Sequence, residues 1–156
     1  MTSDDWQDLI PNRDPWLWID EVLELTDTTI HARKHLTASL PVFQGHYPGF
    51  PLLPGVILCE ACLEASAVLI ADLGVSTEGR VPVATRMNNV KFRRMVRPGE
   101  TIDVRVSLRD RLQDVFYLSG RVEVDGDVAA TLDFVTTAVP PPETHVQESG
   151  DIAIES

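Results

Sequence analysis

The feature of this sequence that most constrains its fold is one long apolar segment, residues 56–73, which ends at Gly74. Its length, its alanines and the terminal glycine predict an α-helix rather than a strand. Because the segment is apolar on nearly every side, other elements must wrap around it. Glu60, Glu64 and Asp72 interrupt it, which favours a buried helix of a water-soluble protein over a membrane span.

Segments of strand-like composition lie on both sides of that helix. Residues 16–25 and 29–40 precede it, and a loop rich in proline and glycine then runs over residues 41–55. After the helix, residues 101–108 alternate between apolar and polar, and two further strands are expected at 115–124 and 128–139, joined by a tight Asp-Gly-Asp turn. One helix and several antiparallel strands predict an α+β domain whose sheet curls around the helix.

The length of 156 residues fits one domain, which we expect over residues 1–139. Residues 1–7 form a polar lead-in. Residues 140–156 open with three prolines, carry acids and lack a sustained pattern, which predicts a disordered acidic tail. No apolar run has the flanks of a signal peptide, so we expect a cytoplasmic protein with no membrane partner. The net charge of −11 argues against a nucleic-acid partner.

The positive charges are unevenly spread along the chain. Residues 80–97 contain no Asp or Glu, yet hold six of the thirteen Lys and Arg residues, namely Arg80, Arg86, Lys91, Arg93, Arg94 and Arg97. Two interpretations stay open for this segment. It is either an anion-binding surface or a set of ordinary solvated charges on the face of a strand.

The two cysteines, Cys59 and Cys62, form a C-x-x-C pair within the predicted helix. Such a pair is compatible with zinc or redox chemistry, but a zinc site requires two further ligands and the chain has no second pair. The simpler interpretation is two small side chains that pack on one side of the helix, so we expect no metal site.

Two acids of the helix are candidates for chemistry. Burying Glu60 among apolar neighbours is costly unless its carboxyl group is paired or protonated, and Glu64 lies one turn later on the same face. Burial and a neighbouring carboxylate both raise the pKa of a carboxyl group, and a protonated Glu is able to act as a general acid. The alternative is that both side chains reach solvent or pair with arginines.

His46 and Gly55 are candidates in the loop before the helix. Prolines and glycines surround His46, and imidazole is the side chain best suited to exchange a proton near neutral pH. Gly55 opens the helix, where free backbone amides are able to bind an anion or a polarised carbonyl oxygen. Taken alone, His46 is also readable as a polar loop residue and Gly55 as a helix start. For His31, His35 and His145 we expect no catalytic role.

The stretch between His46 and Glu60 reads HYPGFPLLPGVILCE. It resembles the active-site motif of the β-hydroxyacyl-acyl carrier protein dehydratases of fatty acid synthesis. The pattern of that family is His, an aromatic residue and Pro, then two residues, Pro, two residues, Pro-Gly, and an acid on the helix. The resemblance continues at residues 10–15, 89–94, 98–100 and 124–126, and spans roughly residues 9–139.

The resemblance implies a hot-dog fold, in which an antiparallel sheet wraps around one long central helix. It implies that His46 removes the α-proton, that Glu60 protonates the departing β-hydroxyl group, and that the Gly55 amide binds the thioester carbonyl. The other residues expected at the substrate site are Pro54, Phe50, Glu64, Phe92, Arg93 and Arg94. No metal or redox cofactor is expected, because the thioester itself acidifies the α-carbon.

The resemblance also implies two partners. One is acyl carrier protein, whose phosphopantetheine arm carries the acyl chain. The other is a second copy of the chain, because the working unit of the family is a homodimer in which the His and the acid of one site come from different subunits. Some members assemble three dimers into a hexamer. Glu at position 60, rather than Asp, resembles the branch that dehydrates without moving the double bond.

The chain departs from the family pattern at three positions. Glu64 stands where Gln is usual, and Asn12 and Asp14 stand in place of a His and an aromatic residue. Three alternative functions stay open. They are an enzyme of the same fold that acts on coenzyme A esters as a hydratase or thioesterase, a dehydratase of a specialised pathway, and a non-catalytic acyl-binding module.

Overall fold

The computed structural model describes residues 5–75, 79–141 and 143. The long helix α2 spans Gly55–Asp72, within one residue of the predicted segment at each end. Two short helical elements precede it, the 3₁₀ helix η1 (Asp5–Leu9) and α1 (Val42–Gly45). The strands are β1 (Glu21–Leu25), β2 (Thr29–His35), β3 (Val81–Phe92), β4 (Thr101–Leu112), β5 (Val115–Val124) and β6 (Asp127–Val139).

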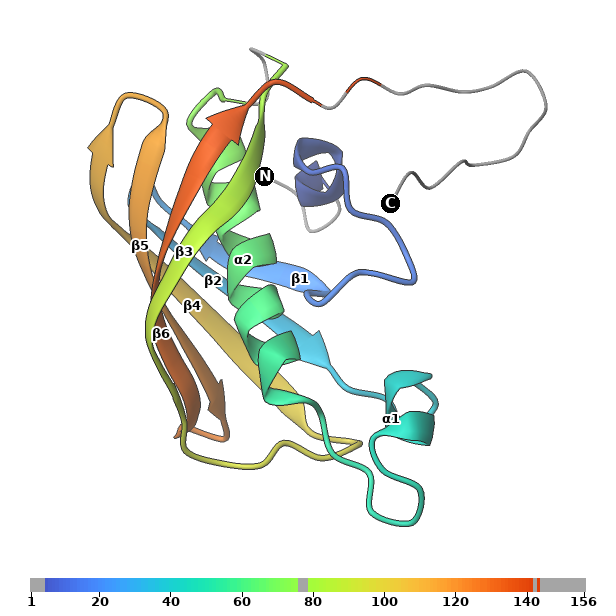
Figure 1. The fold of residues 1–156 in the computed structure, drawn as a ribbon. Coiled ribbons are helices and arrows are strands. Elements are labelled where there is room, and N and C mark those ends of the chain that lie inside the picture. Colours follow the sequence, from blue (N-terminus) through green and yellow to red (C-terminus); the bar gives the residue numbers. More distant parts are fainter. Residues whose placement is uncertain (1–4, 76–78, 142, 144–156) are drawn as a thin grey trace, which may run out of the picture.

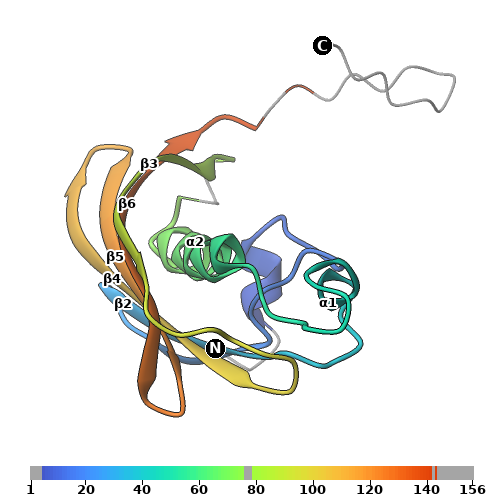
Figure 2. The same cartoon turned by 60° about the horizontal axis from the view of Figure 1, so that its bottom comes forward.

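The six strands form one antiparallel sheet in the order β1-β2-β4-β5-β6-β3 (Figure 1). The strongly curved sheet wraps around α2, which lies on its concave side (Figure 2). This arrangement confirms the predicted α+β hot-dog architecture. Strands β1 and β3 are the two edges of the sheet, and β3 is much the longer of the two, with 12 residues against 5.

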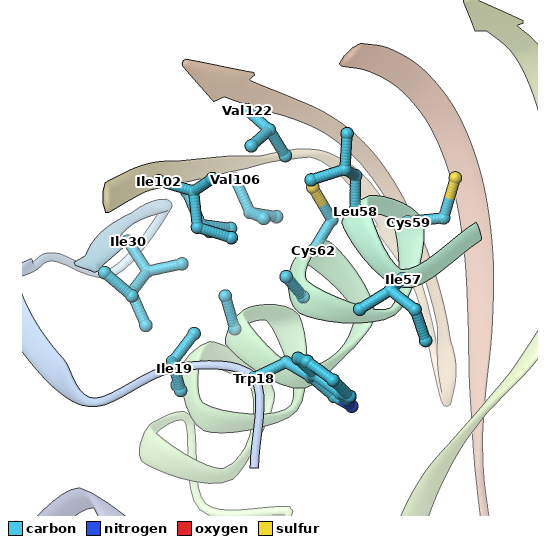
Figure 3. Close-up of a cluster of buried hydrophobic side chains, with 14 of the residues drawn as sticks. Trp18, Ile19, Ile30, Ile57, Leu58, Cys59, Cys62, Ile102, Val106 and Val122 are labelled. Carbon is cyan, nitrogen blue, oxygen red and sulfur yellow. The ribbon is translucent and has the colours of Figure 1, made fainter. Parts of the chain in front are cut away.

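The core lies between α2 and the concave face of the sheet (Figure 3). The predicted alternation of β4 is confirmed, since Ile102, Val104 and Val106 are buried while Arg105 points outward and is exposed. Helix and sheet lie close together where Cys62 faces Gly120 of β5, because a Cβ atom built at Gly120 would lie 2.8 Å from the Cys62 Sγ. Glycine is required there by space alone.

Several sequence expectations are corrected by the structure. Residues 16–20 are not part of the first strand, because Pro15 lies within a turn that the Trp16 amide closes by donating to the Arg13 carbonyl at 2.9 Å. Strand β2 ends at His35 rather than at residue 40, and α1 forms within the segment expected to be a loop. Residues 1–7 were expected to form a polar lead-in, but Trp6 within them is fully buried. Strand β3 was not predicted, because its exposed side chains give no alternation.

The expected domain boundary at residue 139 remains a prediction, and β6 ends at the same residue. Most of the expected disordered tail, residues 140–156, lies outside the described residues. Within the described part of the chain, no helix is long and apolar enough to cross a membrane.

Candidate active site

His46 lies in the loop between α1 and α2, and one of its ring nitrogens is held by the backbone. Its Nδ1 lies 2.9 Å from the Leu52 carbonyl oxygen, and the Leu52 amide donates back to the His46 carbonyl at 2.9 Å. Because a carbonyl oxygen only accepts, Nδ1 must carry the hydrogen of this bond. In the neutral ring, Nε2 is therefore left as a proton acceptor. The Tyr47 ring stacks on the imidazole with 4.0 Å between the centroids.

Gly55 is the first residue of α2, and its position matches the predicted helix start. The preceding residue, Pro54, offers no side-chain cap, so the first amides of the helix have no partner within it. A Cβ atom built at Gly55 would lie 2.8 Å from the Phe92 ring. The absence of a side chain at this position is what allows the ring to lie against the helix start.

An open hollow of about 540 Å³ lies beside Gly55. It is lined by Leu52, Leu53, Gly55, Val56, Leu58, Phe92, Arg93, Arg94 and Met95, and we call it the apolar hollow. Four of the predicted substrate-site residues meet there: Gly55, Phe92, Arg93 and Arg94. Pro54 adjoins it through the chain, and Phe50 lies exposed in the same loop. Loop, helix start and the end of β3 thus meet in one place.

Glu60 lies on α2, one turn beyond Val56, and is partly buried. Its Oε1 accepts a hydrogen bond of 3.0 Å from the indole Nε1 of Trp16. The sequence did not single out Trp16, because a tryptophan in an apolar segment is more often a core residue. The catalytic roles of His46 and Glu60 stay predictions.

Glu64 is the more deeply buried of the two acids, with 2% of its surface exposed. Its Oε1 accepts the backbone amide of Trp18 at 3.0 Å, and its Oε2 has no hydrogen-bond partner among the described residues. The pKa of Glu64 is raised to about 7, mainly by burial and in smaller part by the charge of Glu60, while the Trp18 and Ile19 amides and Lys34 act to lower it. Glu64 therefore lies in the core and does not line the apolar hollow.

A second hollow, of about 430 Å³, lies over the outward-facing positions of β3, β4, β5 and β6. Five cations line it, Lys91, Arg93, Arg105, Arg109 and Arg121, with Asp133 as the one acid of the lining, and we call it the basic hollow. The acid-free segment supplies two of these cations. The other three come from β4 and β5, and the alternation of those strands was the signal that could have found them.

Other basic residues of the acid-free segment have local partners. Arg80 pairs with Asp114, and Arg94 pairs with Glu100 at 2.9 Å while also lining the apolar hollow. Two cations of the segment thus form ion pairs and two line the basic hollow, and the interpretation of the segment as an anion-binding surface stays a prediction.

The two cysteines and the other histidines were the remaining candidates from the sequence, and those that the structure describes are buried or bonded to neighbouring side chains. Cys59 and Cys62 are buried free thiols, and burial raises the pKa of both. Among the described residues, no group of three His, Cys, Asp or Glu side chains is arranged to hold a metal. His31 pairs with Asp103 at 2.8 Å, and His35 bonds to Thr101 at 2.9 Å. His145 lies outside the described residues.

Comparison with known proteins places these features in a family. Residues 10–133 match the family model of the FabA-like domain. The 3-hydroxyacyl-[acyl-carrier-protein] dehydratase FabZ of Oenococcus oeni is 39% identical over 137 residues, which cover 86% of this chain and 97% of that protein. The protein of the same name from Idiomarina loihiensis is 37% identical over 131 residues, which cover 82% of this chain and 87% of that protein.

Solved structures show the same fold. The dehydratase heterocomplex ApeI:P from Xenorhabdus doucetiae has a chain that matches with a TM-score of 0.74 at 15% identity, over 86% of this chain and 90% of that chain. A hypothetical thioesterase from Streptococcus pneumoniae matches with a TM-score of 0.61 at 12% identity, over 78% of this chain and 90% of that chain. At these identities the likeness concerns the fold alone.

Proposed function

The chain belongs to the FabA-like domain family, and from that premise we propose that it dehydrates a 3-hydroxyacyl chain carried on acyl carrier protein, as a hydro-lyase of fatty acid synthesis. The product is the trans-α,β-enoyl thioester. The observation that carries this proposal is the site itself: a histidine whose Nε2 has no partner in the described part of the chain, a glycine amide at a helix start and an apolar hollow beside that glycine. Together they offer a base, an oxyanion donor and room for an acyl chain.

In the proposed reaction His46 and Glu60 move the two protons. Nε2 of His46 takes the α-proton, and the electron pair of that C–H bond forms the α,β double bond as the β-carbon–oxygen bond breaks. Glu60 gives its proton to the departing hydroxyl group, which leaves as water. His46 then holds one proton more and Glu60 one less, and transfer through solvent restores both for the next turnover.

Gly55 has a separate role in this proposal. Negative charge develops on the thioester carbonyl oxygen as the α-proton leaves, and a backbone amide at a helix start is oriented to stabilise it. Phe92 lies against Gly55 at the rim of the apolar hollow, where it shields that oxygen from water. The thioester supplies the acidity of the α-carbon, so we expect no metal or redox cofactor.

Docking of the carrier protein is proposed at the basic hollow. A protein of net charge −11 repels an acidic partner unless a local patch of opposite sign meets it. The basic hollow is such a patch, and Arg93 lines both it and the apolar hollow. A carrier protein bound at the basic hollow would therefore present its phosphopantetheine arm beside the apolar hollow.

A homodimer is proposed through strand β3. Its residues are largely exposed, including Val83 and Met87, and an unpaired strand edge of this length favours pairing with another copy. Val56 on α2 is also exposed, which extends the uncovered apolar surface to the rim of the site. We expect His46 and Glu60 of one site to come from different subunits.

The test is an assay with purified 3-hydroxyacyl-acyl carrier protein, read by mass spectrometry as the loss of one water. We expect turnover by the wild type and none by His46→Ala. The same acyl group on coenzyme A is the matched comparison, and faster turnover of that ester would instead favour a coenzyme A hydratase. Release of free acid would indicate a thioesterase, and no turnover of either substrate would contradict the enzymatic proposal.

A further inference from the structure

The segment between Pro15 and β1 donates a hydrogen bond to each of two acids of α2. The Trp16 indole donates to Glu60 Oε1 at 3.0 Å, and two residues later the Trp18 backbone amide donates to Glu64 Oε1 at 3.0 Å. The two indole rings pack edge to face, with 5.5 Å between centroids and an interplanar angle of 87°. Trp18 is buried, and its backbone amide anchors this segment against α2.

An indole N–H is a donor only, and this decides which oxygen of Glu60 it engages. In a neutral carboxyl group the carbonyl oxygen is the better acceptor, so the indole bond at Oε1 leaves the hydroxyl group on Oε2. His46 shows the same arrangement, because its Nδ1 is held by the Leu52 carbonyl while its Nε2 has no hydrogen-bond partner among the described residues. Each of the two groups therefore has one anchored atom and one available atom.

We propose that Trp16 is a positioning residue for Glu60, holding Oε1 so that Oε2 carries the proton given to the departing hydroxyl group. This inference rests on the proposed dehydration. Trp16 is 47% exposed, so packing alone does not account for it, whereas Trp18 is 5% exposed and is a core residue. The bond is made by a residue outside the motif that carries His46, Gly55 and Glu60.

The chain offers a matched pair of variants for the test. Trp16→Phe removes the N–H group and keeps an aromatic ring against Trp18. Trp18→Phe is the control, because its own indole Nε1 has no hydrogen-bond partner among the described residues and its backbone amide is unchanged. We expect Trp16→Phe to lower kcat about tenfold with KM changed by less than about twofold, as for a lost hydrogen bond to an uncharged group at the upper end of the usual range. We expect Trp18→Phe to keep kcat within about twofold of the wild type.

A second measurement does not depend on turnover. In a ¹H–¹⁵N correlation spectrum, the indole resonance that Trp16→Phe deletes is that of Trp16. Glu60→Ala should move this resonance and leave the Trp18 indole resonance in place. An unmoved Trp16 resonance, or equal kcat values for Trp16→Phe and Trp18→Phe, would overturn the inference. If the wild type itself fails to dehydrate the carrier substrate, the proposed function fails and the inference falls with it.

Discussion

Glu60 and Glu64 lie one turn apart on α2, yet the structure gives them different surroundings. Glu64 is enclosed by the core and bonded to a backbone amide, whereas Glu60 is only partly buried and bonded to an exposed indole. The spacing correctly predicted a shared face, but spacing along a helix does not tell which of the two acids lies deeper. That difference depends on residues 16–18, which are distant in the sequence and cross the helix here.

The two acids should respond oppositely to amide substitution. Glu60→Gln should abolish turnover, with a loss of at least about a hundredfold, because an amide has no acidic proton to give. Glu64→Gln should retain turnover, since Gln keeps an oxygen that accepts the Trp18 amide. The measurement is kcat across a pH series with the carrier substrate. An inactive Glu64→Gln beside an active Glu60→Gln would show that the two roles are reversed.

Glu64 should also make stability depend on pH. Its pKa is raised from 4.5 to about 7 in the folded chain, mainly by burial. Between those values the folded state binds more protons than the unfolded state, so stability should fall as pH rises through this range and level off above it. Glu64→Gln removes that loss. Relative to the wild type, it should gain on the order of 2–3 kcal/mol between pH 4 and pH 8.

Chemical denaturation at the two pH values measures this difference. Glu24→Gln, at an exposed position of β1, controls for the removal of one negative charge. A stability difference between Glu64→Gln and the wild type that is the same at both pH values would contradict the prediction.

At the scale of elements, the contact between α2 and β5 sets how closely the helix lies against the sheet. Cys62 Sγ occupies the space that a side chain at Gly120 would need. The sequence places Cys62 on the helix and Gly120 in a strand, and it predicted that the cysteines pack as small side chains, as Cys62 does against Gly120. The sequence could not show that Cys62 and Gly120 meet, because that contact depends on how the sheet curves around the helix.

Gly120→Ala should therefore destabilise the domain through overpacking. The added methyl group would lie 2.8 Å from Cys62 Sγ and 3.1 Å from Leu132, both buried. We expect a loss of about 1–3 kcal/mol in the free energy of unfolding, measured by urea denaturation. Adding Cys62→Ala should recover part of that loss, because it removes the sulfur atom. If Gly120→Ala lowers the free energy of unfolding equally in the wild-type and the Cys62→Ala backgrounds, the predicted contact with the sulfur is wrong.

At the scale of the whole molecule, the question is how two copies of the chain make a site. Val56 lies one turn before Glu60 on α2 and is exposed, and the half-exposed Trp16 bonds to Glu60. The edge strand β3 is also largely exposed. Cover by a second copy would shield these groups from water, which strengthens hydrogen bonds and ion pairs within the site.

Mixing two inactive variants tests whether the site is shared. If His46 and Glu60 of one site come from different subunits, a dimer of one His46→Ala chain and one Glu60→Gln chain has one intact site and one doubly altered site. Equal mixing after reversible unfolding should then restore about a quarter of wild-type activity, because half of the dimers are mixed and each has one of two sites. No recovery, with mixed dimers demonstrated by mass spectrometry, would mean that each chain forms its own site.

The basic hollow makes a prediction about the carrier protein. Replacing Lys91 and Arg121 by Glu should raise KM for the carrier-bound substrate about tenfold and leave kcat nearly unchanged, because the contact is remote from the reacting atoms. Added salt should raise KM of the wild type more than that of the variant. Arg97→Glu, an exposed cation of the acid-free segment outside the hollow, is the control. Equal KM values for the wild type and the Lys91 and Arg121 variant at low salt would show that the basic hollow is not part of the docking surface.

Local pattern was enough to predict much of this protein. The apolar segment with its terminal glycine predicted α2 within a residue at each end, because segment length, composition and helix end signals are properties of neighbouring residues. The same holds for the alternation of β4 and for the motif from His46 to Glu60, whose spacing identified the family. Each of these features depends only on residues within a short stretch of the sequence.

Only the tertiary structure decided which distant residues meet. Trp16 reaches Glu60 and Trp18 reaches Glu64 because the segment before β1 crosses α2, and Arg105, Arg109 and Arg121 join Lys91 and Arg93 because four strands lie side by side. Burial is likewise a property of the packed chain, which is why Trp6 in a polar segment is enclosed and β3, at the sheet edge, is not. Sequence spacing fixes neighbours along the chain, whereas contacts across the sheet depend on its order and curvature.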